Sequence, residues 1–198
     1  DARGEPLDNT LIAMDARAER ECAWLGEQLG RRALFEITGQ PLHPMYSLNK
    51  ILWWKNNKPE VYRQAHKFLC WQDYAVARLG CDPVIDYSLA SRMFTFDLRQ
   101  KTWNTRILET AGLSPDRLPL PQPSGTIIGT VSPSAASGLG LTPQTRVVAG
   151  GFDQPAAALG AGILAPGVAV DGLGTVECVT PALDRPVTDD ALLEGNIP

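Results

Sequence analysis

The last quarter of the chain constrains the fold most strongly, because strand-like and helix-like segments alternate there. The apolar run RVVAGG (146–151) is typical of a buried strand, and it leads through two glycines to Asp153. Residues 154–162 are rich in alanine and glycine, as in a closely packed helix. The segment VAVDGLGTVECVT (168–180) predicts two strands joined by a glycine turn. This alternation is typical of an α/β domain.

The preceding part of the chain predicts mostly helices, joined by turns and a few short strands. Apolar residues recur every three or four positions up to Leu29, and Gly30 follows as a stop signal. Ser47 and Pro59 are typical helix starts. The predicted helices cover residues 15–29, 47–57, a short stretch from 59, 72–79 and 103–111, with a helical turn at 133–138. Strands are predicted at 93–96 and 126–131, and the proline-rich stretch 113–125 is neither a regular helix nor a central strand.

Composition excludes several classes of protein. The 198 residues carry a net charge of −4, so the basic excess of a nucleic-acid-binding protein is missing. No run of about 18 apolar residues is present, which argues against a membrane span, and the polar start lacks the pattern of a signal peptide. The four cysteines show no CxxC spacing and are interpreted as ordinary thiols in a reducing compartment, which favours the cytoplasm.

The motif GGFDQ (150–154) is the sharpest candidate for chemistry. Its two glycines allow a sharp turn after the strand, so that Asp153 is presented at the start of a helix. A helix N-terminus favours the ionised carboxylate, which can accept a proton from a hydroxyl group. From these residues alone, Asp153 is equally interpreted as the N-cap of that helix.

Two further motifs contain turn-forming residues that suit ligand binding. The turn GLGT (172–175) can direct backbone N–H groups at a phosphate, although an ordinary hairpin has the same composition. The run DYSLASR (86–92) offers hydrogen-bonding groups for a polyol, but the same groups can fix a turn.

The remaining polar and aromatic candidates are weaker. In MDAR (14–17), Asp15 and Arg17 suit either sugar hydroxyls or pairing near the first helix. His43 and His66 are isolated and are interpreted as structural or exposed. The tryptophans are expected mostly in the core, with one available to stack on a sugar ring; these are Trp53, Trp54 and Trp71.

Taken in order, these segments resemble the FGGY carbohydrate kinases, which include xylulose, glycerol, gluconate and fuculose kinases. The matching segments are MDARAE, ITGQPLHPMYSLNKILWWK, WQDYAVARL, DYSLASRMFTFDLRQKTWN, LPLPQPSGTIIGTV, VVAGGFDQPAAALGAG and DGLGTVEC. The resemblance implies an α/β, ribonuclease H-like fold of the actin and hexokinase type, with two domains around a cleft. Residues 1–145 would be the later part of the N-terminal sugar-binding domain, and residues 146–198 the start of the C-terminal nucleotide-binding domain. Only part of each domain would be present, so the chain alone is expected to be inactive.

The resemblance also implies roles for individual residues. Asp153 matches the catalytic base, and Gln154 after it matches a substrate-binding residue. Asp15 and Arg17 match a region that flanks the sugar, and Met45 and Tyr46 fall where some relatives place a substrate-contacting aromatic ring. Gly174 and Thr175 match the turn that holds the phosphates of the nucleotide, and no residue is assigned to a metal.

The implied activity is ATP-dependent phosphorylation of a sugar hydroxyl with Mg²⁺. A ketopentose such as xylulose is the expected substrate, and gluconate, fuculose, glycerol or another polyol is the alternative. The family's usual tryptophan is replaced by Ala13, and GTVEC replaces a run of smaller residues, so the sequence leaves the sugar open. The expected partners are the sugar and ATP, and a homodimer is compatible with the family. Two alternative functions remain: the protein is a non-catalytic sugar-binding or regulatory member of the family, or it is a purely structural α/β domain.

Overall fold

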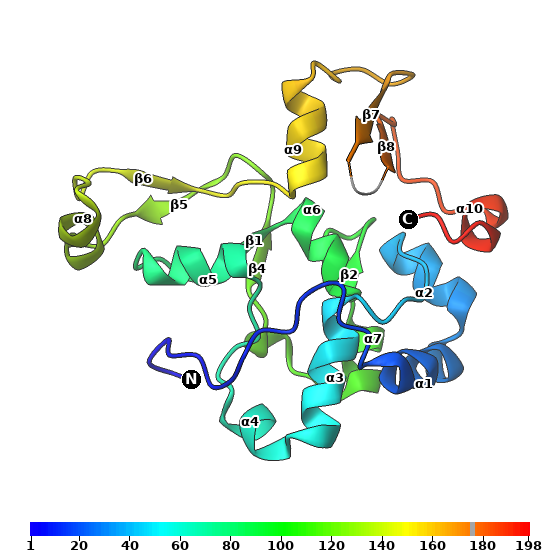
Figure 1. Ribbon diagram of the computed structural model, residues 1–198, viewed down its shortest axis with the longest axis horizontal. Helices are drawn as coiled ribbons and strands as arrows, with labels where there is room; N and C mark the ends of the chain where they lie inside the picture. Colours follow the sequence, from blue (N-terminus) through cyan, green and yellow to red (C-terminus); the bar gives the residue numbers. More distant parts are fainter. Residues whose placement is uncertain (175–176) are drawn as a thin grey trace.

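The computed structural model describes residues 1–174 and 177–198, which form many short helices and paired strands (Figure 1). The α-helices are α1 Glu19–Leu29, α2 Arg31–Thr38, α3 Ser47–Asn57, α4 Pro59–Gln64, α5 Trp71–Arg78, α6 Tyr87–Ala90, α7 Thr105–Ala111, α8 Pro133–Leu139, α9 Asp153–Gly160 and α10 Asp190–Glu194. The strands are β1 Val84–Asp86, β2 Phe96–Asp97, β3 Thr102–Trp103, β4 Leu120–Gln122, β5 Ile127–Thr130, β6 Arg146–Val148, β7 Ala169–Leu173 and β8 Glu177–Pro181. Two 3₁₀ turns, η1 Ser91–Met93 and η2 Pro115–Arg117, complete the described elements.

The larger hydrophobic core lies within residues 19–118, which we call the helical body. Leu25 of α1, Leu48 of α3 and Ile107 of α7 are fully buried in one cluster with Phe94 and Phe96. Burying each such side chain contributes about 1.5–3 kcal/mol. The apolar spacing of the first predicted helix therefore has a physical consequence, because its apolar face is what holds α1 against α3 and α7.

The described strands form four pairs. β1 and β4 run parallel, with Ile85 opposite Pro121, and β2 pairs with β3 in an antiparallel hairpin. β5 pairs antiparallel with β6, and a second cluster that includes Val131 and Val147 packs this pair against α5 and α8.

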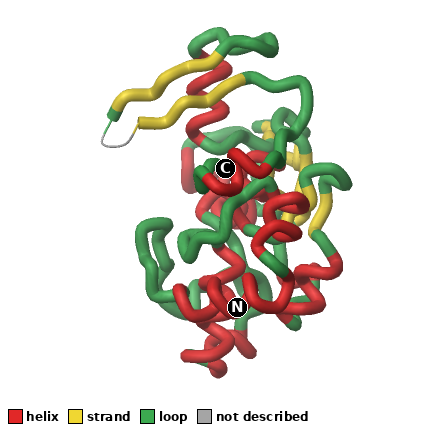
Figure 2. The backbone as a smooth tube through the Cα atoms, turned by 90° about the vertical axis from the view of Figure 1, so that its right-hand side faces the viewer, coloured by secondary structure: helices red, strands yellow, loops and turns green. Residues whose placement is uncertain are grey.

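The C-terminal part has far fewer buried hydrophobic side chains than the helical body. Residues 150–198, here called the outer segment, contain α9, the β7–β8 hairpin and α10. Figures 1 and 2 show α9 and the hairpin together at the end of the molecule opposite the N-terminus. Among the described residues of this segment, the buried hydrophobic side chains are Ala158 and Leu193. None of the described helices combines the length and the apolar character needed to cross a bilayer.

Many of the predicted elements are confirmed. The helix at 47–57 has the predicted bounds, α4 begins with proline at its first position, and α9 and the β7–β8 pair follow in the predicted order. The first helix starts at Glu19 rather than residue 15. All four cysteines are free thiols, as expected. The proline-rich stretch contributes one short strand, β4, whose described partner is β1 alone.

Several predictions were wrong, and each failure has a local cause. Residues 93–96 were expected as a strand, but Phe94 has a φ of 63°, which ends η1 and delays the strand to Phe96. Gly30 ends α1 as predicted, but α2 was not predicted; it begins directly after Gly30, because a φ of 84° turns the chain without adding a loop. The strand at 146–148 was expected to be buried, but in β6 only Val147 is buried, and Arg146 and Val148 are exposed.

The three tryptophans expected mostly in the core do not lie there, whereas Trp103 does. Trp53 and Trp54 are half-buried, and Trp71 is 67% exposed.

Candidate functional site

Asp153 is the first residue of α9 and is exposed to solvent. Its Oδ1 atom accepts a hydrogen bond of 2.9 Å from the backbone N–H of Gln154. The N-cap position is occupied by Phe152, which makes no side-chain capping bond, so Asp153 is not the N-cap residue. The geometry therefore presents the carboxyl group of Asp153 to solvent at the start of α9.

The residues before Asp153 form an open backbone segment. A Cβ atom on Gly150 would meet nothing within 4 Å, and one on Gly151 would meet only hydroxyl oxygens, those of Ser124 at 3.8 Å and Ser88 at 3.9 Å. The N–H of Phe152 donates to the Ser88 hydroxyl at 2.8 Å. The segment that presents Asp153 is thus held by a hydrogen bond to a residue 64 positions earlier in the chain.

A cavity of about 590 Å³ extends to Phe152 from the side of the helical body. It is also lined by Met45, Tyr46, Arg92 and Lys50. The Arg92 guanidinium lies 5.2 Å from the ring centre of Tyr46 and 5.4 Å from that of Phe152. Two of the predicted substrate-binding residues, Met45 and Tyr46, therefore share one cavity with the residue that precedes Asp153.

Asp15 and Arg17 are paired with each other. The Nε of Arg17 lies 2.9 Å from each carboxylate oxygen of Asp15, and its guanidinium lies 4.9 Å from the ring centre of Trp53. These hydrogen bonds from Arg17 lower the pKa of the Asp15 carboxyl. Ile12 and Ala13, but neither residue of this pair, line the cavity. The pair lies just before α1, as the pairing interpretation of MDAR predicted.

Gln154 and the β7–β8 hairpin lie close together. A Cβ atom on Gly172 would lie 3.7 Å from the side-chain oxygen of Gln154. Gly174 follows the end of β7 and is exposed, whereas the predicted Thr175 lies outside the described residues. β7 at Gly172 therefore lies beside the side chain of Gln154 in the first turn of α9.

The motif DYSLASR fixes a turn and also makes contacts beyond it. Asp86 is fully buried and caps α6, accepting the N–H groups of Ser88 and Leu89. Ser88 and Arg92, however, both reach Phe152. Phe152 itself was not singled out from the sequence, and the only signal for it was an apolar residue between two glycines and an aspartate.

The described residues include no cluster of three or more His, Cys, Asp or Glu side chains that could hold a metal ion.

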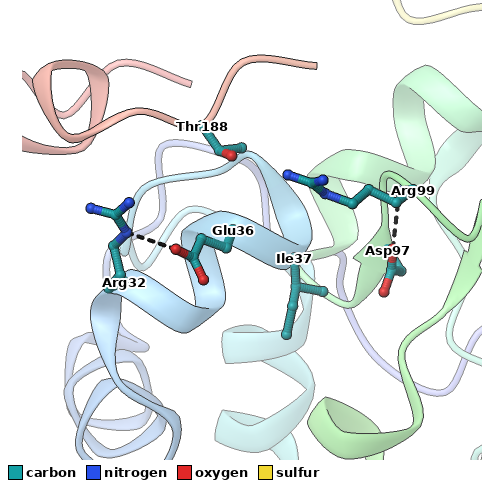
Figure 3. A pocket seen from close by; sticks show the side chains of 6 residues that line it. All are labelled: Arg32, Glu36, Ile37, Asp97, Arg99 and Thr188. Carbon is teal, nitrogen blue, oxygen red and sulfur yellow. Dashed lines mark hydrogen bonds and ion pairs between the residues drawn. The ribbon is translucent and has the colours of Figure 1, made fainter. Parts of the chain in front are cut away.

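A second cavity, of about 520 Å³, lies between α2 and the residues after β2 (Figure 3). Arg32 and Glu36 form an ion pair of 2.9 Å at its edge, and Arg99 and Thr188 also line it. It contains none of the predicted site residues.

Known proteins match the chain over most of its length. The model of the FGGY family of carbohydrate kinases, N-terminal domain, matches residues 1–160. Gluconokinase from Bacillus licheniformis is 32% identical over 190 residues, which cover 96% of this chain and 37% of that protein. Xylulose kinase from Bacillus subtilis is 31% identical over 169 residues, which cover 85% of this chain and 34% of that protein. The chain therefore spans little more than a third of the length of these relatives.

Solved structures give the same result for the fold. Gluconate kinase from Lactobacillus acidophilus superposes with a TM-score of 0.87 at 25% identity, covering 94% of this chain and 38% of that one. The ligand-bound xylulose kinase from the same organism gives the same values. These similarities confirm the expected α/β fold of the actin and hexokinase type. Because the family model matches residues 1–160, the chain belongs to the FGGY family of carbohydrate kinases.

Proposed function

We propose that the full-length protein transfers the γ-phosphoryl group of ATP to a sugar hydroxyl, with Asp153 as the base. The observation that carries the proposal is the exposed carboxylate of Asp153 directly after Phe152, which lines the 590 Å³ cavity with Met45 and Tyr46. A group at this position can accept the hydroxyl proton while a sugar occupies the cavity. Phosphoryl transfer depends mainly on such positioning and on charge stabilisation.

The other predicted residues have roles in binding. Met45 and Tyr46 would contact the sugar from the helical body, and Gln154 would contact it from α9. Asp15 and Arg17 would flank the sugar site as a pair rather than as separate ligands, since their charges already neutralise each other.

The nucleotide would be held beside the β7–β8 hairpin, away from the cavity proposed for the sugar. When bound, ATP supplies the phosphoryl group and Mg²⁺ offsets the charge of its phosphates. Gly174 and Thr175 are proposed to hold those phosphates through the turn after β7. We also propose that the chain divides near residue 145 into a sugar-binding part, with Met45 and Tyr46, and a nucleotide-binding part, with Gly174 and Thr175.

The substrate is proposed to be a ketopentose such as xylulose or the sugar acid gluconate. Xylulose kinases and gluconokinases are both among the relatives, and the gluconokinase match covers 96% of the chain against 85% for the xylulose kinase. Ala13 lines the cavity where the family usually has tryptophan, so recognition here depends less on stacking and more on polar contacts.

The test is release of ADP from Mg-ATP by the full-length protein, across ketopentoses, hexoses, gluconate, glycerol and other polyols. One sugar should stimulate release, and Asp153→Asn should lower that rate about 10²- to 10⁴-fold. Asp184→Asn is a matched control, because Asp184 is exposed and lies away from the predicted site residues in the sequence.

Two results would contradict the proposal. Wild-type turnover in Asp153→Asn would remove this residue from the chemistry. A folded protein that binds ATP but responds to no sugar would favour the non-catalytic alternative.

A further inference from the structure

The buried carboxylate of Asp86 organises the start of α6. One oxygen, Oδ1, accepts the N–H groups of Ser88 at 2.9 Å and Leu89 at 3.2 Å, and the Ser88 hydroxyl also contacts it. A carboxylate accepts and a hydroxyl can donate, so the Ser88 proton points at Asp86. The lone pairs of the Ser88 oxygen are then available to another donor.

That donor is the backbone of the residue before Asp153. The Phe152 N–H donates to Ser88 Oγ at 2.8 Å, and Phe152 is the N-cap residue of α9. A hydroxyl hydrogen-bonded to a carboxylate is a stronger acceptor than a free one, because each bond polarises the next. The chain Asp86–Ser88–Phe152 thus links the buried helical body to the first turn of α9.

The Phe152 side chain is held by the same motif. Arg92, in η1, lies with its guanidinium 5.4 Å from the Phe152 ring centre and donates to the Gln40 side-chain oxygen at 3.1 Å. An arginine over an aromatic ring is attracted to it electrostatically. Residue 152 is therefore held both by its backbone and by its ring.

This anchor matters because the segment before it has little support of its own. Gly150 and Gly151 have wide conformational freedom, and a Cβ on Gly150 would touch nothing within 4 Å. Asp153 is exposed, and its side chain accepts a hydrogen bond from its own neighbour Gln154. The direction of its carboxylate thus depends on how Phe152 is fixed.

We infer that Ser88 is a positioning residue for Asp153, acting through the Phe152 N–H, with Arg92 holding the Phe152 ring. The inference rests on the proposed role of Asp153 as the base. An error of about 1 Å in the position of a reacting group can cost about 10²-fold in rate. Ser88 itself needs no contact with sugar or nucleotide in this role.

The experiment compares Ser88→Ala, Ser88→Thr and Ser91→Ala in the full-length protein. Ser91 belongs to the same motif, but its hydroxyl donates to the Ser88 carbonyl at 2.8 Å and not to the outer segment. Ser88→Ala should lower kcat about 10- to 100-fold while KM for the sugar stays within about threefold, because the loss concerns the transition state. Ser88→Thr keeps the hydroxyl and should restore kcat to within about threefold of wild type.

Hydrogen exchange at the Phe152 amide gives a readout that does not depend on activity. Ser88→Ala should speed exchange at this amide about tenfold or more, because its acceptor is lost, whereas Ser91→Ala and Asp153→Asn should leave it unchanged. Unchanged exchange in Ser88→Ala, or a loss of kcat in Ser88→Thr equal to that in Ser88→Ala, would overturn the inference. Full activity of Asp153→Asn would instead overturn the proposed base, so the two failures are distinguishable.

Discussion

The helical body and the outer segment differ in how their side chains are held. In the body, large side chains such as Phe94 and Ile85 are fully buried in a shared core. In the described part of the outer segment, Leu159, Leu164 and Leu173 are all exposed by more than 60%. The body therefore carries most of the stability of this chain, while the candidate base belongs to the more exposed region. The contrast teaches that the candidate base lies in a segment with little core of its own. That segment is fixed by the contacts of Phe152 with Ser88 and Arg92 of the helical body.

The sharpest test of this contrast is the substitution Phe35→Ala. Phe35 is fully buried in α2, and removing its ring should lower the free energy of unfolding by about 3–5 kcal/mol, because a cavity replaces packed atoms. Urea denaturation of the full-length protein measures the change. A loss below about 1 kcal/mol would show that the body is not the main source of stability.

A second test uses the pH dependence of the body. Burial raises the pKa of Asp73 to about 7, well above its value of 3.8 when exposed. The folded protein therefore keeps this proton between about pH 4 and 7 while the unfolded chain loses it, so stability falls as the pH rises through that range. The slope should approach about 1.4 kcal/mol per pH unit at most.

The variant Asp73→Asn checks this dependence. Asparagine can still accept the Cys70 N–H that Asp73 accepts at 2.8 Å, but it cannot ionise. Urea midpoints measured from pH 4.5 to 7 should therefore depend less on pH in Asp73→Asn, whereas the exposed Asp116→Asn should follow the wild type. Identical slopes in all three proteins would contradict the assignment.

A third test concerns the attachment of the loop after α4, which lines the cavity. Arg117 donates to the Ala65 carbonyl at 2.7 Å, and its guanidinium lies within 5 Å of the ring centres of Tyr62 and Phe68. Arg117→Lys keeps the charge but loses the planar group that lies near both rings. We expect a loss of about 1–2 kcal/mol in urea denaturation. No loss would mean that this loop is held by its other contacts.

The smallest effect is expected in the outer segment. Leu159 on α9 is 63% exposed, so Leu159→Ala should change the stability of the described arrangement by less than about 0.5 kcal/mol. A cost of several kcal/mol in the full-length protein would show that another part of the protein covers this face of α9. That result would remove the difference in stability between the two regions. Thermal melts of Leu159→Ala and Phe35→Ala, measured side by side, give the two losses of stability.

Sequence alone determined the elements whose signals are local. The proline at the beginning of α4 and the helix after GGFDQ follow from proline geometry and composition, each of which acts within a few residues. The placement of Asp153 at a helix start was predictable for the same reason. The start of α3 was predicted from Ser47 as an N-cap, but Ser47 is the first helical residue and Tyr46 is the N-cap, without a side-chain capping bond.

Tertiary structure decided the contacts between distant segments. The parallel pairing of Val84 with Leu120 and the hydrogen bond from Phe152 to Ser88 join residues 36 and 64 positions apart. Such contacts depend on how the helices pack around the core, and no periodicity in the chain encodes which hydroxyl meets which backbone N–H. The sequence therefore determined that an aspartate begins α9, and only the folded chain decided that Ser88 and Arg92 hold the residue before it.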